Sequence, residues 1–219
     1  MKIFKWIKRI LLGLFIFSIV MVFVYKWIPV PLTELMLKRY LVNGSTIEKE
    51  WVPLPQIANS MQLAVVSSED QNFLKHYGFD FKEIQKILEQ EGAPKRGGST
   101  ISQQTAKNVF LWDGRNFIRK GLEAYFTCLI EWIWGKKRIM EVYLNVIEFG
   151  DGIYGVESAS QHYFGKSAAN LTRSESATLA ALLPNPREYG KNINGRYIKK
   201  RKNWILRQMS NLGGSLTFP

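Results

Sequence analysis

Residue types that often carry catalytic or metal-binding chemistry are scarce in this sequence. Its 219 residues include one cysteine and two histidines, and they contain no Gly-x-Ser-x-Gly elbow and no phosphate-binding P-loop. Cys128 therefore has no partner for an internal disulfide, and its place in an apolar helical run predicts a small buried side chain. His76 and His162 lie outside any metal-binding spacing. These absences exclude a disulfide scaffold and a histidine-rich metal site.

Acidic residues are outnumbered by basic ones. The sequence has 30 Lys and Arg against 18 Asp and Glu, which gives a formal charge of +12. Such a chain attracts anions, and nucleic acid, lipid headgroups and phosphate-bearing substrates all remain open on composition alone. An apolar content of 46% excludes a disordered chain.

The N-terminal segment contains a long apolar run. Residues 10–25 carry no charge and follow four basic residues within positions 2–9. Counted from Ile7, the run approaches the roughly 20 residues that span a bilayer. The basic flank places the N-terminus in the cytoplasm. A cleaved signal peptide is the alternative, but no small-residue cleavage site follows the run. We therefore predict that residues 1–28 form a cytoplasmic flank and a retained transmembrane anchor.

The rest of the chain divides into a connector and a helical domain. Residues 29–55 contain four prolines and predict a connector with a short helix around Leu35. Residues 56–219 show helical apolar spacing nearly throughout, with capping boxes at Asp80, Thr100 and Thr172. A helix over 116–134 is expected to turn these apolar residues inward: Phe117, Leu122, Phe126, Leu129 and Ile133. Because no alternating strand pattern competes, the predicted fold class is all-α.

Two carboxylates stand where the first helix of the domain is expected to end. Glu69 and Asp70 follow an apolar stripe that begins at Ile57. A carboxylate at a helix C-terminus meets the negative end of the helix dipole, and an adjacent carboxylate adds repulsion. Both effects favour protonation and suit a group that transfers protons. A solvated pair of loop carboxylates is the alternative.

Polar and basic residues surround the next two helix starts. Gly97 and Gly98 let a ligand approach the backbone, and the helix that begins after Thr100 offers free N–H groups to a phosphate. A plain turn with a capping threonine is the alternative. Arg119 and Glu123 share one face of the following helix, where a surface ion pair is the alternative, although Arg before Glu is the less favourable order.

Taken in order, these segments resemble the five motifs of the lysozyme-like peptidoglycan glycosyltransferases. The motifs read EDQNFLKHYG at 69–78, GGSTISQQTAKN at 97–108, RKGLE at 119–123, KKRIMEVYLN at 136–145 and RKNWIL at 201–206. Met140 stands where leucine is usual, which is neutral for packing. The resemblance covers about residues 52–209, and the length and anchor resemble the monofunctional branch of Gram-negative bacteria. It implies a lysozyme-like glycosyltransferase domain behind one N-terminal transmembrane helix.

The resemblance also implies a reaction. A glycan on undecaprenyl diphosphate would be the donor and lipid II the acceptor, with Glu69 as general base for an inverting transfer. Glu123 would be the second acid and hold the donor diphosphate, either directly or through Mg²⁺ or Mn²⁺, and no organic cofactor is expected. The basic residues expected at the leaving group are Lys107, Arg115, Arg119 and Lys120. The other expected substrate contacts are Asp70, Phe73, His76, Ser99, Thr100, Gln103, Gln104 and Asn108.

Location and partners follow from the same resemblance. It implies a single-pass protein of the bacterial cytoplasmic (inner) membrane with its catalytic domain in the periplasm. Expected partners are the membrane, lipid II, lipid-linked glycan and other cell-wall synthesis and division proteins. Nucleic acid is not expected, because the basic domain is exported. Inhibitors of the moenomycin type, which mimic the donor's lipid phosphate and sugars, are expected to bind.

Two other functions compete with this one. A lytic glycan hydrolase also uses a glutamate at a helix end, but it needs no basic residues around a second acid. An inactive scaffold is disfavoured because Glu69 and Glu123 are both present. The Ser-x-x-Lys and Lys-Thr-Gly signatures of penicillin-binding transpeptidases do not occur in the sequence, so we expect no transpeptidase activity.

Overall fold

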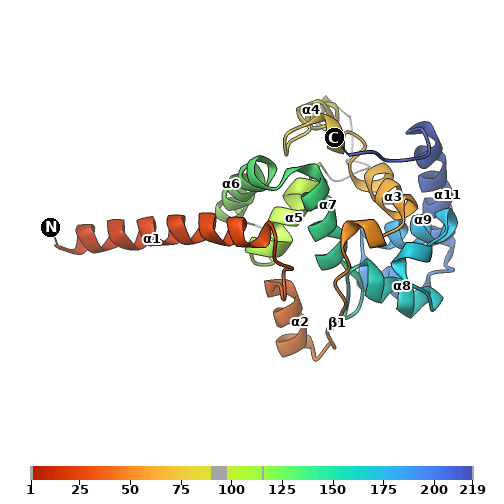
Figure 1. Cartoon of the computed structure of the whole chain (residues 1–219), viewed down its shortest axis with the longest axis horizontal. Helices are drawn as coiled ribbons and strands as arrows, with labels where there is room; N and C mark the ends of the chain where they lie inside the picture. Colours follow the sequence, from red (N-terminus) through yellow and green to blue (C-terminus); the bar gives the residue numbers. More distant parts are fainter. Residues whose placement is uncertain (1, 90–97, 115, 219) are drawn as a thin grey trace.

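A long N-terminal helix projects from a helical body in this computed structural model, which describes residues 2–89, 98–114 and 116–218 (Figure 1). The α-helices are α1 (Lys2–Tyr25), α2 (Glu34–Asn43), α3 (Asn59–Glu69), α4 (Phe81–Glu89), α5 (Ile101–Phe110), α6 (Phe117–Ile133), α7 (Gly135–Val146), α8 (Val156–Phe164), α9 (Arg173–Leu182), α10 (Pro186–Tyr189) and α11 (Arg196–Asn211). Short 3₁₀ helices are η1 (Leu54–Gln56), η2 (Phe73–Lys75), η3 (Ala168–Asn170) and η4 (Gly190–Asn192). The predicted helix around Leu35 is confirmed as α2.

A small sheet interrupts the otherwise helical fold. Its strands are β1 (Glu48–Lys49), β2 (Glu148–Gly150) and β3 (Ile153–Tyr154), in the order β1-β3-β2. β1 is parallel to β3, and β2 is antiparallel to β3. Strands of two or three residues are too short to show an alternating pattern, so the sequence did not predict them. The all-α fold class is nevertheless confirmed, because these strands are a minor addition.

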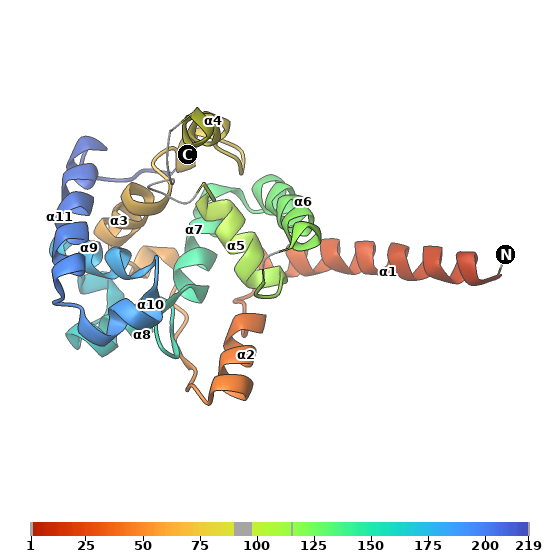
Figure 2. The same cartoon turned by 180° about the vertical axis from the view of Figure 1, so that it is seen from behind.

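Two groups of helices build the core. α3, α9 and α11 pack together at the end of the body away from α1, and α5 packs against α6 and α7 nearer to α1 (Figures 1 and 2). Fully buried apolar side chains fill the first group, including Met61, Leu179 and Ile205. The carboxyl end of α3 meets α5 between the two groups, so residues there face both.

Helix starts follow the predicted capping residues. The Thr100 hydroxyl accepts a hydrogen bond from the amide of Gln103 at 3.2 Å, and the Gln103 side chain accepts one from the amide of Thr100 at 3.0 Å. Thr172 forms the same reciprocal box at the start of α9, and Asp80 accepts from the amide of Glu83 at 3.0 Å. All three predicted helix starts are confirmed.

The predicted orientation of α6 is partly wrong. Phe126 is buried and Leu129 is partly buried, as predicted. Phe117, however, is 97% exposed, and Leu122 is also exposed. The free thiol of Cys128 is exposed too, which contradicts the predicted buried cysteine. The reason is that α6 carries more than one apolar stripe, and only one of them packs on the body.

The face of α6 that packs inward is partly charged. Arg119, Glu123 and Thr127 are buried there together with Ile130. Burial of a charged pair requires that both partners remain close together in the low-dielectric interior. The face of α6 that carries Arg119 and Glu123 therefore packs on the body, and Phe117 and Leu122 stay exposed.

The N-terminal helix is fixed to the body by side chains of α6 and α7 and of the turn between them. The indole N–H of Trp134 donates to Val22 O at 2.7 Å, and Arg138 donates to the carbonyls of Tyr25 and Ile28, each at 2.8 Å. Arg138 thus satisfies carbonyls that the end of a helix leaves free. Within the described residues, α1 is the helix long and apolar enough to cross a membrane, which is compatible with the predicted anchor.

The fourth motif holds the segment that precedes the domain. Asn145 on α7 exchanges two 2.9 Å hydrogen bonds with the backbone of Val52, and Glu141 accepts from the amide of Leu54 at 2.9 Å. Arg138, Glu141 and Asn145 therefore lie on one face of α7 and bind residues 25–54 through their backbone. The domain boundaries predicted after residues 28 and 55 stay predictions.

Candidate active site

Glu69 lies at the end of α3 and is partly exposed. Its Oε1 accepts from the Ser68 hydroxyl at 2.8 Å, and its Oε2 accepts from the side-chain amide of Gln104 on α5 at 3.3 Å. The Gln104 carbonyl accepts from the hydroxyl of Tyr143 at 3.2 Å. Burial, together with the charges of Glu69 and Asp70, raises the pKa of Tyr143 well above its usual range. Tyr143 therefore stays protonated and holds the Gln104 amide toward Glu69.

The fifth motif supports the same carboxylate from the other side. Arg201 on α11 donates to the carbonyl and the hydroxyl of Ser68, at 3.4 and 3.3 Å. Its guanidinium lies 4.4 Å from the centroid of the Trp204 ring. Because Ser68 in turn donates to Glu69, Arg201 acts on the carboxylate through one intermediate side chain.

Asp70 points into the body and has its own partners. Its carboxylate lies 2.9 Å from His76 Nε2 and accepts from the amide of Ile101, at the start of α5, at 3.0 Å. The positive end of the α5 dipole stabilises this charge. Phe73 is fully buried in the same segment. Asp70, Phe73 and His76 thus form a packed cluster that follows Glu69 in the chain, and their contact with substrate stays a prediction.

The start of α5 already holds an anion, which is the Asp70 carboxylate itself. Thr100 and Gln103 are buried in the capping box, and the Thr100 hydroxyl also donates to Gly78 O at 2.6 Å. The free N–H groups predicted for a phosphate are therefore partly occupied by protein groups. Ser99 is partly exposed beside them. Gly97 of the same motif, and Arg115 after α5, lie outside the described residues.

Lys107 lies one turn after Gln104 on α5 and is partly buried. Its ammonium has no hydrogen-bond or ion-pair partner among the described residues. Desolvation by burial lowers the pKa of Lys107, and the nearby charge of Glu123 partly opposes this. A partly buried cation without a partner among residues 2–89, 98–114 and 116–218 is costly there, so the position suits an anion supplied from outside these residues.

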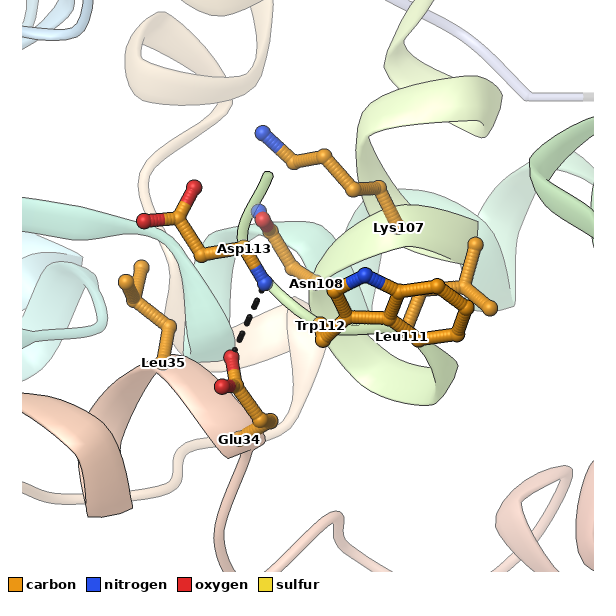
Figure 3. Close-up of a pocket in the computed structure, with 7 residues that line it drawn as sticks. All are labelled: Glu34, Leu35, Lys107, Asn108, Leu111, Trp112 and Asp113. Atoms are coloured by element: carbon orange, nitrogen blue, oxygen red, sulfur yellow. Dashed lines mark hydrogen bonds between the residues drawn. The ribbon is translucent and has the colours of Figure 1, made fainter. Parts of the chain in front are cut away.

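A small pocket of about 20 Å³ lies beside Lys107 (Figure 3). It is formed between the start of α2 and the end of α5, and its residues are Glu34, Leu35, Lys107, Asn108, Leu111, Trp112 and Asp113. Glu34 accepts from the amide of Asp113 at 3.0 Å and closes one side. Figure 3 shows the Lys107 ammonium extended away from the Trp112 ring. Asn108 is buried in the wall of this pocket.

Glu123 is the most buried acid of the predicted site, at 3% exposure. Arg119 donates to its Oε2 at 2.7 Å, and Lys120 contacts its Oε1. Arg before Glu is the less favourable order for an exposed pair. Here both charges are buried, so each compensates for the charge of the other in the low-dielectric interior. Lys120 keeps about half of its side chain exposed. The cluster thus presents a partly exposed cation beside a buried ion pair.

The predicted divalent ion has no complete set of protein ligands in the part of the chain described. No three His, Cys, Asp or Glu side chains within these ranges are grouped to hold a metal. Both Glu123 oxygens are engaged by cations, so an ion bound there would have to displace Arg119 or Lys120. We therefore derive no step through a metal, and Mg²⁺ or Mn²⁺ stays a prediction.

Three residues that contact Glu69 or its partners were not among the predicted site residues. Ser68 on α3 donates to Glu69 itself, Tyr143 on α7 donates to Gln104, and Arg201 on α11 donates to Ser68. Tyr143 and Arg201 belong to the fourth and fifth motifs, which is the signal that could have identified them. Sequence spacing alone could not identify these two, because α7 and α11 meet the end of α3 only in the tertiary fold.

Comparison with known proteins agrees with this arrangement. The profile of the Transglycosylase family matches residues 36–210. The biosynthetic peptidoglycan transglycosylase of Shewanella oneidensis is 49% identical over 217 residues, which cover 97% of this chain and 93% of the relative. The proteins of the same name from Pasteurella multocida and Caulobacter vibrioides are 52% and 51% identical, over 92% and 90% of this chain and 84% and 88% of the relatives. The chain therefore belongs to the transglycosylase family of lysozyme-like peptidoglycan glycosyltransferases.

Proposed function

We propose that this protein polymerises lipid II into glycan strands, with Glu69 as general base and undecaprenyl diphosphate as leaving group. One observation carries the proposal. On α5, Gln104 contacts the Glu69 carboxylate, and one turn later Lys107 presents an ammonium without a partner among the described residues. A carboxylate held by one turn of α5, and on the next turn a cation without a partner in the described part of the chain, suit a reaction in which a hydroxyl loses a proton while a diphosphate leaves.

Glu69 would act on the acceptor sugar. Its Oε2 takes the proton of the acceptor 4-hydroxyl while that oxygen forms a bond to the anomeric carbon of the donor. The bond from this carbon to the diphosphate oxygen breaks on the opposite face, so the configuration inverts. Ser68 and Gln104 hold the carboxylate in place, and a positioned base of this kind typically contributes about 10²–10⁴ in rate.

The cations near Glu123 would receive the leaving group. Lys107 and the partly exposed Lys120 can contact the diphosphate, whose negative charge grows as the bond breaks. Glu123 holds Arg119 and Lys120, so we assign it the positioning of these cations. Arg115 is proposed to add charge to the same site.

Membrane attachment fits both substrates, because donor and acceptor are lipid-linked. We propose that α1 crosses the cytoplasmic membrane once, with its basic N-terminal flank in the cytoplasm and the catalytic domain in the periplasm. Other cell-wall synthesis and division proteins are proposed partners in the same membrane. We further propose that the chain has no transpeptidase activity.

Polymerisation of lipid II by the purified full-length protein tests the proposal. Incubation with labelled lipid II should give a ladder of glycan polymer on a gel. Glu69→Gln keeps the shape of the side chain but cannot take the proton, and should lower polymerisation by about 10²–10⁴. It should still bind a moenomycin-type phosphoglycolipid. Glu188→Gln, which changes an exposed glutamate on α10, is the matched control and should stay active.

Two outcomes would contradict the assignment. Polymerisation by Glu69→Gln, together with inactivity of Glu123→Gln, would show that Glu123 is the base. Degradation of finished sacculi in the absence of lipid II would favour a lytic hydrolase.

A further inference from the structure

We infer that the outer face of α2 is a second lipid contact, which rests on the outer leaflet of the membrane beside the anchor. This inference rests on the proposed anchoring by α1 and extends it to a helix that does not cross the membrane. Its occupant is the boundary between headgroups and acyl chains.

An apolar stripe on α2 has no partner among the described residues. Leu37, Tyr40 and Leu41 are 43%, 56% and 75% exposed. Their spacing of three and four residues places them on one side of the helix. Met36, one turn before Tyr40, is fully buried, so the body borders the stripe on that side. Such a contiguous exposed stripe usually marks an interaction surface.

The charged side chains of α2 are committed to the body. Lys38 forms an ion pair with Asp113 at 3.2 Å, and Arg39 lies 3.8 Å from the buried carboxylate of Glu148. Glu34 accepts from the amide of Asp113. Lys38 and Arg39 lie outside the stripe. Glu34, one turn before Leu37 on the same side of the helix, borders the stripe at its amino end, where its carboxylate is hydrogen-bonded to the body.

The position of α2 turns this stripe toward the membrane. Arg39 reaches Glu148 of β2, and Figure 1 shows β1, a strand of the same sheet, on the side of α2 away from the projecting end of α1. On a helix, Leu37 and Leu41 lie opposite Arg39. They therefore face the side from which α1 projects. Both views place α2 beside the carboxyl end of α1, with its axis across that of the anchor (Figures 1 and 2).

The segment between the two helices continues the apolar surface. Trp27, Ile28 and Leu32 are exposed between the end of α1 and the start of α2. Tyr40 and Trp27 have an apolar ring and a polar tip, which suits the headgroup level of a bilayer. Continuity with the anchor favours lipid over a soluble protein partner, since an amphipathic helix at this height lies in the interface.

Site-specific fluorescence on the full-length protein tests this inference. In a Cys128→Ser background, Leu41→Cys would carry an environment-sensitive fluorophore, and Leu37→Cys would be a second reporter on the same stripe. Leu14→Cys in α1 reports the anchor, and Lys199→Cys on α11, at the far end of the body, reports water. The protein is reconstituted in vesicles of phosphatidylethanolamine and phosphatidylglycerol.

The expected result is a blue shift of both α2 probes and their quenching by lipids that carry a quencher near the headgroup. Iodide in the buffer should quench the Lys199→Cys probe and leave the α2 probes bright. If iodide quenches both α2 probes while the Leu14→Cys probe responds only to lipid quenchers, the α2 inference is overturned and the anchor stands. If iodide quenches the Leu14→Cys probe as well, the proposed anchoring fails first.

Discussion

Among single residues, Lys107 links protonation to the proposed chemistry most directly. Desolvation lowers its pKa below the ordinary lysine value of 10.5, so its ammonium loses the proton at a lower pH than a surface lysine does. If the ammonium stabilises the leaving diphosphate, polymerisation should fall on the alkaline side, below pH 10.5. Lys107→Arg retains its charge at higher pH and should move this fall upward.

Measurement of polymerisation rate against pH checks this, with Lys199→Arg on α11 as a matched control whose profile should be unchanged. Lys107→Ala should lower the rate by about 10²–10³ at neutral pH, the scale for loss of one preorganised charge. An alkaline limb that is identical in the wild type and in Lys107→Arg would contradict the assignment.

Tyr143 gives a second prediction at this scale. Its buried hydroxyl fixes the orientation of Gln104, and Gln104 donates to Glu69. Tyr143→Phe should therefore lower kcat by about 10-fold, since loss of one hydrogen bond is worth about 1.4 kcal/mol. The KM for lipid II should change little, because Tyr143 is fully buried.

Tyr163→Phe is the matched control for Tyr143→Phe. Burial raises the pKa of Tyr163 to about 12, and its hydroxyl donates to Phe149 O at 3.2 Å, away from Glu69. An equal loss of kcat in both variants would indicate general destabilisation rather than positioning of Glu69.

At the scale of helices, the two reciprocal capping boxes should differ in strength. Thr172→Ala removes a cap at an exposed position on α9 and should lower the free energy of unfolding by about 1 kcal/mol. Thr100 is buried and also donates to the carbonyl of Gly78. Thr100→Ala leaves that buried acceptor without its donor, so we expect a loss of about 2–3 kcal/mol.

Denaturant unfolding of both variants in one detergent compares the two helices. Similar midpoints for Thr100→Ala and Thr172→Ala would show that the contact with Gly78 contributes nothing to stability.

The residues at which helices begin were predictable from sequence, whereas the face of a helix that packs on the body was less predictable. Thr100 and Gln103 cap α5 through local bonds, which depend only on neighbouring residues. The inward face of α6 depends on what lies beside it, and a buried Arg119–Glu123 pair faces the body where apolar Phe117 was expected. The occupation of the α5 start by Asp70 is likewise a tertiary contact, 31 residues apart in sequence.

For the whole molecule, the proposed topology gives a simple prediction. Alkaline phosphatase folds actively only after export, so its fusion after Pro219 should give an active enzyme in intact cells. A matched fusion that lacks residues 1–28 should be inactive, since it has no anchor to direct export. An inactive but stable full-length fusion would refute the periplasmic orientation.

The bonds from Trp134 and Arg138 to the end of α1 have a mechanical consequence. A domain on a loose tether would rotate freely and sample every orientation above the bilayer. These bonds join the helix to the body, so in the proposed topology the candidate active site would keep a constant height and tilt above the bilayer while the molecule diffuses sideways. Encounter with a lipid-linked sugar, the proposed substrate, would then be a search in two dimensions at one fixed level.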